Sequence, residues 1–224
     1  MLTAEMRHYV ARQVMTMATE HQKSLVLVID DDPSVRNGLT LLFRSVGFET
    51  RAFGSAQEFL QSTLPDVPSC LVLDVRLPGQ SGLDFQAGLV THIPIIFMTG
   101  HGDIPMTVRA MKGGAVDFLA KPFRDQDMLD AVATAIERDR KRRASEKILS
   151  DLRALFETLS PRECEVMALV SSGLMNKQIA AELNLAEITV KIHRGRIMKK
   201  MHARSVADLV KMAETLGVRR TNQK

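Results

Sequence analysis

The feature that most constrains the fold of this chain is a series of five short apolar runs in its first half. The runs are rich in strand-forming residues and bounded by turn residues, so we expect five strands buried on both faces. Segments with helical spacing of apolar residues lie between them. The runs cover 25–29, 48–53, 70–73, 94–98 and 115–119, and the helical segments cover 33–46, 55–62, 82–90 and 103–112. This alternation predicts an α/β fold with a parallel, doubly wound sheet.

Polar side chains follow four of these predicted strands directly. Asp30 and Asp31 follow the first strand, and Asp74 follows the third. Thr99 follows the fourth strand and Lys121 the fifth. Because parallel strands end at the same edge of a sheet, we expect these side chains to meet. Three crowded carboxylates repel one another unless a cation joins them, and oxygen ligands of this kind suit Mg²⁺.

Asp74 is the candidate reactive group, because it stands at the carboxyl end of a strand, where open parallel sheets place their chemistry, and a loop with proline and glycine follows it. A carboxylate can attack phosphorus and form an aspartyl phosphate. Phosphoryl transfer needs positive charge and donors on the phosphoryl oxygens, which Mg²⁺, the Lys121 ammonium and the Thr99 hydroxyl can supply. The alternative is that Asp74 only caps the turn that follows it.

Residues 24–124 resemble the receiver domain of two-component response regulators. The matching pieces are Asp30-Asp31, LVLDVRLPGQSG at 71–82, TG at 99–100 and FLAKPF at 118–123, in the same order and spacing. The resemblance implies a flavodoxin-like (βα)5 domain in which Asp74 accepts a phosphoryl group from a histidine kinase. The implied Mg²⁺ ligands are three carboxylates and one main-chain carbonyl, from Asp30, Asp31, Asp74 and Arg76.

The same resemblance implies further roles. Thr99 and Lys121 contact the phosphate, and Phe118 swings inward together with Thr99. The Lys121–Pro122 bond is expected to be cis, which X–Pro bonds permit at small cost. One departure is that the segment 82–93 is a few residues shorter than usual, so we expect a short third helix.

Residues 125–158 contain no glycine or proline and are rich in helix formers. Their first part carries apolar residues that can pack on the sheet, and a second apolar stripe begins at Ile148. Residues 137–147 carry no such stripe. We therefore expect one long helix with a solvated middle, the alternative being a break near 144–145. The basic run 138–143 is interleaved with acids, which favours a solvated linker over a nucleic-acid arm.

The last part of the chain predicts four short helices, at 161–172, 176–183, 186–201 and 205–216. The third of these directs Val190, Ile197 and Met201 inward. Its surroundings carry one acid, Glu187, against six basic residues, which are Lys191, Arg194, Arg196, Lys199, Lys200 and Arg204. A short helix, a tight turn and a basic amphipathic helix predict a helix-turn-helix whose third helix enters the major groove. The alternative is a helix with a solvated basic face.

Residues 159–216 resemble the LuxR-type DNA-binding domain. The matching pieces are LSPRE at 159–163, GLMNKQIAAEL at 173–183 and TVKIHRGRIMKKM at 189–201. The resemblance implies base contacts by Lys191 and Ile192. Gly195 replaces a larger side chain of the relatives, which removes a potential base contact and weakens the helix by up to about 1 kcal/mol. The implied phosphate or register contacts are Lys177, Thr189, Arg194 and Lys199.

Charge and composition agree with this organisation. Residues 1–124 carry 11 basic and 12 acidic side chains, whereas residues 150–224 carry 13 and 8, so the positive balance lies in the predicted DNA-binding part. No apolar run approaches the roughly 20 residues that span a bilayer, and the first residues do not form a secretory signal. The two cysteines, Cys70 and Cys164, indicate buried thiols in a cytoplasmic protein.

The two resemblances together identify the chain as a member of the NarL/FixJ type of response regulators, a transcription factor and not an enzyme. The expected parts are an N-terminal extension (1–23), a receiver domain (24–124), a final receiver helix and linker (125–158), a LuxR-type domain (159–217) and a tail (218–224). The expected partners are a sensor histidine kinase, double-stranded operator DNA, RNA polymerase and, on phosphorylation, a second copy of the chain. No membrane contact is expected, and activation of transcription is expected over repression.

Two other functions stay open on the sequence. Asp30-x-Asp32 with Thr99 and Lys121 also resembles phosphatases of the haloacid dehalogenase type. That family requires a further acidic pair after the lysine, where this chain becomes helical, and it leaves Asp74 without a role. The second alternative is a regulator that binds DNA regardless of phosphorylation.

Overall fold

A computed structural model describes residues 24–89, 91–100 and 104–218 of the chain. It divides into two compact units, residues 1–143 and 144–224, which are described separately. The predicted N-terminal extension and most of the predicted tail lie outside the described residues. Within the described residues, no helix combines the length and apolar character that crossing a membrane requires.

The first unit is built on a five-stranded sheet with every strand parallel to its neighbours, as predicted. The spatial order is β2-β1-β3-β6-β7. The strands are β1 (Leu25–Ile29), β2 (Glu49–Phe53), β3 (Ser69–Asp74), β6 (Ile95–Thr99) and β7 (Asp117–Ala120). The prediction that all five strands are buried is wrong for the two outermost strands, because β2 is mostly exposed and β7 is only half-buried.

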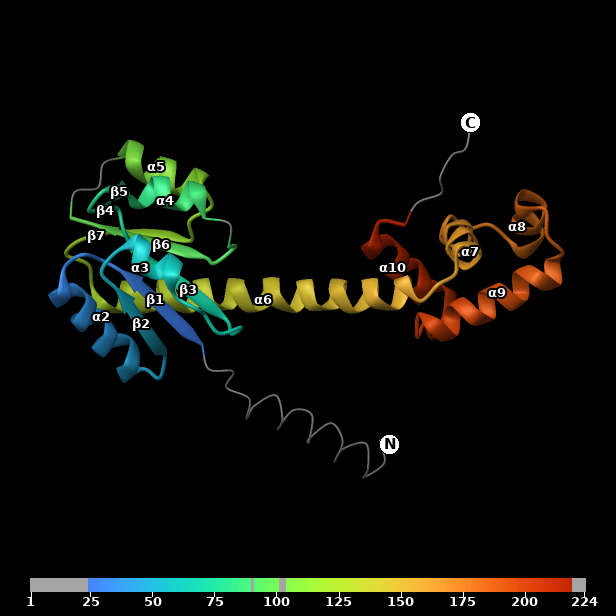
Figure 1. The fold of residues 1–224 in the computed structure, drawn as a ribbon, viewed down its shortest axis with the longest axis horizontal. Helices are drawn as coiled ribbons and strands as arrows, with labels where there is room; N and C mark the ends of the chain where they lie inside the picture. The colour runs from blue at the N-terminus through green and yellow to red at the C-terminus, as the bar shows by residue number, and fades with distance from the viewer. Residues whose placement is uncertain (1–23, 90, 101–103, 219–224) are drawn as a thin grey trace, which may run out of the picture. The chain divides into compact units, whose positions relative to one another are not determined.

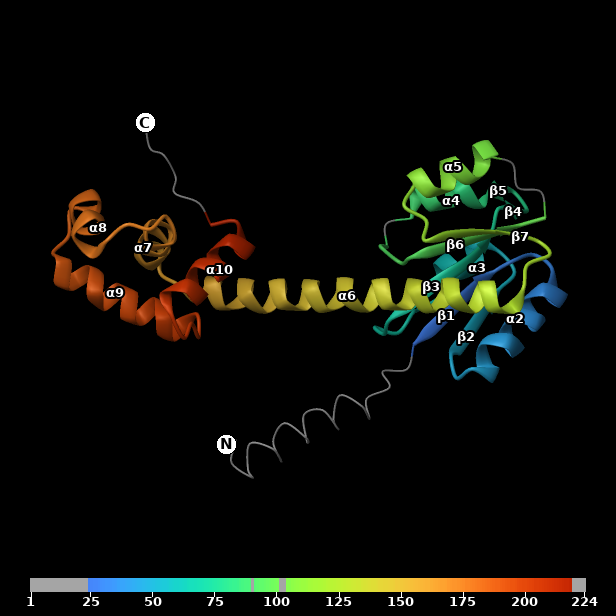
Figure 2. The same cartoon turned by 180° about the vertical axis from the view of Figure 1, so that it is seen from behind.

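Helices cover both faces of this sheet. Alternate residues of β1 point to opposite faces, so Leu27 packs in one core and Val28 in the other. Figures 1 and 2 show α4 and α5 on one face and the first part of α6 on the other. The bounds are α2 (Pro33–Ser45), α3 (Ala56–Gln61), α4 (Gly82–Gly88) and α5 (Ile104–Lys112). Each fully buried Leu or Val contributes about 1.5–3 kcal/mol to this packing.

Local sequence determines where these helices begin and end. Asp32 caps α2 by accepting a hydrogen bond from the main-chain N–H of Ser34, and Pro33 occupies the first turn. Val46, at which the predicted helix ends, lies just after the end of α2 and is 51% exposed. Helix α4 has only seven residues, which confirms the predicted short helix. The small hairpin of β4 (Arg76–Leu77) and β5 (Gln80–Ser81) was not predicted.

Helix α6 (Asp125–Glu157) is continuous, which confirms the single long helix. Its middle is not wholly solvated, and that part of the prediction is wrong. Asp139 is fully buried and accepts a hydrogen bond from the main-chain N–H of Ser69 at 2.9 Å. Arg142 and Arg143 also donate to its carboxylate. A carboxylate can be buried here because each of its oxygens has charged or main-chain donors.

The second unit is a small helical domain with its own core. After the end of α6 it contains α7 (Pro161–Ser171), α8 (Asn176–Leu183), α9 (Glu187–Lys200) and α10 (Val206–Leu216), close to the predicted bounds. Ser160 and Glu163 form a reciprocal capping box at the start of α7. The left-handed backbone of Asn184 makes the tight turn between α8 and α9. Val190, Ile197 and Met201 are fully buried, as predicted.

Candidate functional site

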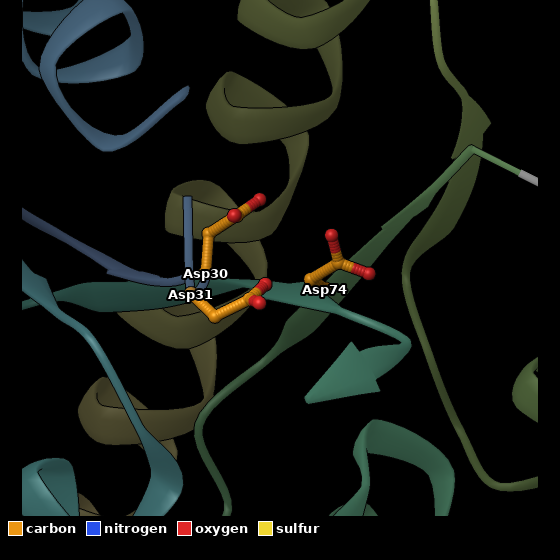
Figure 3. Close-up of side chains that lie close together, drawn as sticks. All are labelled: Asp30, Asp31 and Asp74. Atoms are coloured by element: carbon orange, nitrogen blue, oxygen red, sulfur yellow. The ribbon is translucent and has the colours of Figure 1, made fainter. Parts of the chain in front are cut away.

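Three carboxylates gather where β1 and β3 end. Asp30 is fully buried, Asp74 is nearly so, and Asp31 is exposed. One oxygen from each lies within 4.8 Å of the others. Figure 3 shows Asp30 and Asp31 side by side with Asp74 next to them on the neighbouring strand. The predicted meeting of these side chains at the sheet edge is therefore present in the structure.

Lys121 joins two of these carboxylates. Its Nζ lies 2.6 Å from Asp74 Oδ2 and 2.7 Å from Asp30 Oδ2. The main-chain N–H of Lys121 donates to the carbonyl of Thr99 at 2.7 Å, which ties the end of β7 to the end of β6. The Lys121–Pro122 peptide is cis, as predicted. Lys121 therefore reaches the aspartates from a strand two positions away from β3.

The electrostatics of the site follow from this geometry. Burial raises the pKa of Asp30 above its ordinary value, although the hydrogen bond from Lys121 opposes this effect. Burial by itself would lower the pKa of Lys121, but its hydrogen bonds to Asp30 and Asp74 outweigh burial, and the pKa is raised. The ammonium therefore stays charged and balances the carboxylates.

Main-chain groups orient the two buried carboxylates. The N–H of Arg76 donates to Asp74 Oδ1 at 2.8 Å, and the N–H of Asp32 donates to Asp30 Oδ1 at 2.8 Å. The side chain of Arg76 is exposed. Gly82 has no room for a side chain, because a Cβ there would collide with the main-chain oxygen of Asp74. The turn after β3 therefore depends on a glycine at this position.

Arg36 is a site residue that the sequence reasoning missed. Its Nη1 donates to the main-chain carbonyls of Asp30 at 2.7 Å and Asp31 at 2.9 Å. The guanidinium thus holds the loop that carries both aspartates. Its place one helical turn after Asp32 is the only sequence signal for this contact.

The two predicted switch residues lie on the neighbouring strands β6 and β7. Thr99 is fully buried at the end of β6. Phe118 on β7 is half-buried, and its ring centroid lies 6.4 Å from that of Phe97. Thr99 therefore lies at the carboxyl end of the sheet, as Asp74 does, whereas Phe118 lies two residues before the end of β7.

In the second unit, α8 and α9 carry the predicted DNA contacts. Lys177, Lys191 and Lys199 are exposed, and Ile192 is 49% exposed. Gly195 is exposed, with nothing within 4 Å of the position of a Cβ. These residues are therefore accessible to a ligand.

Two other residues predicted to contact DNA, Thr189 and Arg194, are less accessible. Arg194 donates to Asn176 Oδ1 at 2.6 Å, which links α9 to the start of α8. Thr189 is half-buried. The position of Arg194 suits a role in fixing the two helices relative to each other.

Lys200, one of the six basic residues counted around this helix, forms an ion pair with α7. Its ammonium lies 2.6 Å from Glu163 Oε2, and Glu163 is only 2% exposed. The hydrogen bond from Lys200, together with the main-chain N–H of Ser160, lowers the pKa of Glu163 to about 2. This pair ties the start of α7 to the end of α9.

Comparisons with known proteins agree with both units. Residues 26–133 match the family described as Response regulator receiver domain, and residues 157–213 match the family described as Bacterial regulatory proteins, luxR family. The chain belongs to the response regulators that combine a receiver domain with a LuxR-type DNA-binding domain, the NarL/FixJ family.

Among its relatives is Nodulation protein W of Bradyrhizobium diazoefficiens, 71% identical over 88% of each chain. The transcriptional regulatory protein FixJ of the same species is 40% identical over 88% of this chain and 97% of its own. A solved structure of the response regulator StyR is 50% identical, with a TM-score of 0.77 over 86% of this chain and 98% of its own. This chain is thus a response regulator whose relatives include transcriptional regulators.

Proposed function

We propose that Asp74 accepts a phosphoryl group from the phosphohistidine of a sensor kinase. The observation that carries this proposal is that Asp74 shares the Lys121 ammonium with Asp30 in an acidic cluster at the sheet edge. A carboxylate oxygen of Asp74 attacks phosphorus, and the bond from phosphorus to the histidine nitrogen breaks. The imidazole leaves with the electron pair of that bond, and an acyl phosphate remains on Asp74.

Mg²⁺ fits the cluster, because carboxylate oxygens of this number and spacing are the ligands it prefers. Asp30, Asp31 and Asp74 would hold the ion together with the carbonyl of Arg76. The ion supplies positive charge to the phosphoryl oxygens. Lys121 and the Thr99 hydroxyl contact the remaining oxygens, and they stabilise the charge that develops there during transfer.

Phosphorylation then leads two copies of the chain to pair. Thr99 moves toward the phosphoryl group, and Phe118 follows it inward. The adjoining helix α5 carries a face that a second copy would cover, because three large apolar side chains are exposed there at helical spacing. These are Ile104 (81% exposed), Val108 (45%) and Met111 (44%).

The pair binds an operator through α9, whose N-terminal half enters the major groove. Lys191 and Ile192 contact base edges, and Gly195 leaves space beside them. The remaining residues contact phosphates or set the register, and they are Lys177, Thr189, Arg194 and Lys199. We infer that the bound pair contacts RNA polymerase and activates transcription in the cytoplasm.

We assign these functions to parts of the chain at the boundaries predicted from the sequence. We assign residues 24–124 to the receiver, 125–158 to its final helix and the linker, and 159–217 to DNA binding. The protein works as a regulator and not as an enzyme with turnover.

The test compares the full-length chain with and without phosphorylation by acetyl phosphate and Mg²⁺. Sedimentation gives its mass, and DNA selected from a random pool gives the operator. We expect a dimer and tighter operator binding only after phosphorylation. Equal operator affinity in both states would favour the phosphorylation-independent regulator. Many turnovers on a small phosphate ester would favour the phosphatase.

A further inference from the structure

The receiver unit contains a cavity of about 480 Å³ beside the amino end of β6, far along the strand from the acidic cluster. The end of α4, the loop that leads to β6, the turn between α5 and β7, and α6 together form its walls. The short helix α4 is one reason for the space, because the chain leaves this helix at Leu89. The cavity beside this short helix is therefore not part of the phosphorylation site.

Basic groups line one side of the cavity. Arg138 and Arg142 stand four residues apart on α6, so both lie on the same face of the helix. Arg138 forms no ion pair with any described residue. His92 adds a further nitrogen donor or acceptor from the loop before β6. The lining residues include no Asp or Glu.

The buried Asp139 fixes one of these groups in place. Nε and Nη2 of Arg142 both donate to Asp139 Oδ1, at 3.0 and 2.6 Å. The other oxygen of Asp139 accepts from Arg143 and from the main-chain N–H of Ser69. Burial would raise the pKa of Asp139, but these hydrogen bonds outweigh burial and lower it, so the carboxylate stays ionised. The guanidinium of Arg142 is therefore ordered before any ligand arrives.

The lining also contains apolar side chains, among them Leu89, Ile93 and Ile95. A volume of this size lies within the range of small-molecule sites, about 300–1,000 Å³. A lining that combines apolar side chains with two arginines suits a ligand with an apolar body and one anionic group. Guanidinium groups bind carboxylates and phosphates through paired hydrogen bonds, which gives orientation as well as affinity.

We propose that this cavity is a binding site for a small anion with an apolar body, with the guanidinium of Arg138 binding its charge and Arg142 supplying a second positive charge at the lining. The anionic group is a carboxylate or a phosphate ester. The site is separate from the acidic cluster, so binding does not require phosphorylation or Mg²⁺.

The test is calorimetric titration of the full-length, unphosphorylated chain with 1-naphthoate, 1-naphthyl phosphate and uncharged 1-naphthalenemethanol. We expect saturable binding of at least one of the two anions and much weaker binding of the alcohol. Arg138→Gln should weaken anion binding about tenfold or more, since a charge-assisted hydrogen bond is lost. Arg140→Gln is the matched control, because Arg140 is exposed on the same helix, pairs with Glu137 and does not line the cavity.

A second variant tests whether the ligand binds inside the cavity. Thr91→Trp adds bulk at the lining of the cavity and should abolish binding while the helical content and the labelling of Asp74 stay unchanged. The naphthoate and naphthyl phosphate titrations also tell the two anionic groups apart. Absence of saturable binding of both anions, or binding that Arg138→Gln and Thr91→Trp leave unchanged, would overturn the proposal.

Discussion

Lys121 lies 2.6 Å from Asp74 through its ammonium, and the same nitrogen lies 2.7 Å from Asp30. One lysine therefore neutralises part of a crowded acidic cluster and stands beside the carboxylate that we assign as the phosphoryl acceptor. Because these hydrogen bonds raise its pKa, the lysine is charged over the physiological pH range. A phosphoryl group on Asp74 would find this positive charge already in position.

Arg36 is expected to position the loop that holds the metal ligands. Arg36→Ala removes the hydrogen bonds to the carbonyls of Asp30 and Asp31 and should weaken Mg²⁺ binding about 10-fold to 100-fold, as the loss of other supporting groups does. Calorimetric titration with Mg²⁺ measures the effect. Arg36→Lys should recover part of the affinity, because an ammonium can still donate to a carbonyl. Arg44→Ala, at the exposed end of α2, is the control, and equal effects of Arg36→Ala and Arg44→Ala would refute this role.

The pair of Glu163 and Lys200 should make the DNA-binding unit sensitive to acid. The pKa of Glu163 is about 2 in the folded chain and about 4.3 in an unfolded one, so its contribution to stability is present above about pH 4.3. That contribution is lost as the pH falls from about 4.3 to about 2. Glu163→Gln should therefore lower the stability of the unit near neutral pH by about 1–3 kcal/mol. It should also make the stability depend less on pH below about pH 4.3.

Hydrogen exchange at the amides of α7, together with acid titration by circular dichroism, measures both effects. Glu165→Gln is the matched control, because the side chain of Glu165 is half-exposed and its carboxylate forms an ion pair with the nearby Arg162. Equal protection of α7 in the two variants would show that the buried ion pair contributes nothing to the unit.

Two lysines should separate base contacts from phosphate contacts. Lys191→Ala should reduce the discrimination between operator and random DNA by about 1–3 kcal/mol. Lys177→Ala should weaken binding to operator and to random DNA equally, and it should reduce the slope of log affinity against log salt concentration by about one. Binding assays over a range of salt concentrations measure both, with the exposed Lys211→Ala on α10 as a control. Identical behaviour of the first two variants would show that the recognition face is assigned wrongly.

The sequence predicted the sheet and its acidic edge well, because buried parallel strands have continuous apolar runs and the residues after them are fixed in space by topology. Asp30, Asp74 and Lys121 were found in this way. The predicted helix bounds of the second unit are close to the observed ones, because local features such as the Ser160 cap and the left-handed turn at Asn184 limit the helices.

Features that depend on packing between distant segments were not predictable. Asp139 lies in a charged run typical of a solvated helix, and only the position of α6 beside the start of β3 explains its burial. The burial of β2 was overestimated, because its place at the sheet edge cannot be read from its composition. Lys200 was counted with the basic residues around α9, and its ion pair was not predicted because its partner Glu163 is 37 residues away in the chain.

The most direct test of the central claim is phosphoryl labelling of Asp74. Wild-type chain and Asp74→Asn are incubated with labelled acetyl phosphate and Mg²⁺, and the bound phosphate is measured before and after hydroxylamine, which cleaves acyl phosphates. We expect one phosphoryl group on the wild type, removed by hydroxylamine and absent in excess EDTA, and none on Asp74→Asn. Labelling of Asp74→Asn to the level of the wild type, or labelling that persists in EDTA, would contradict the account.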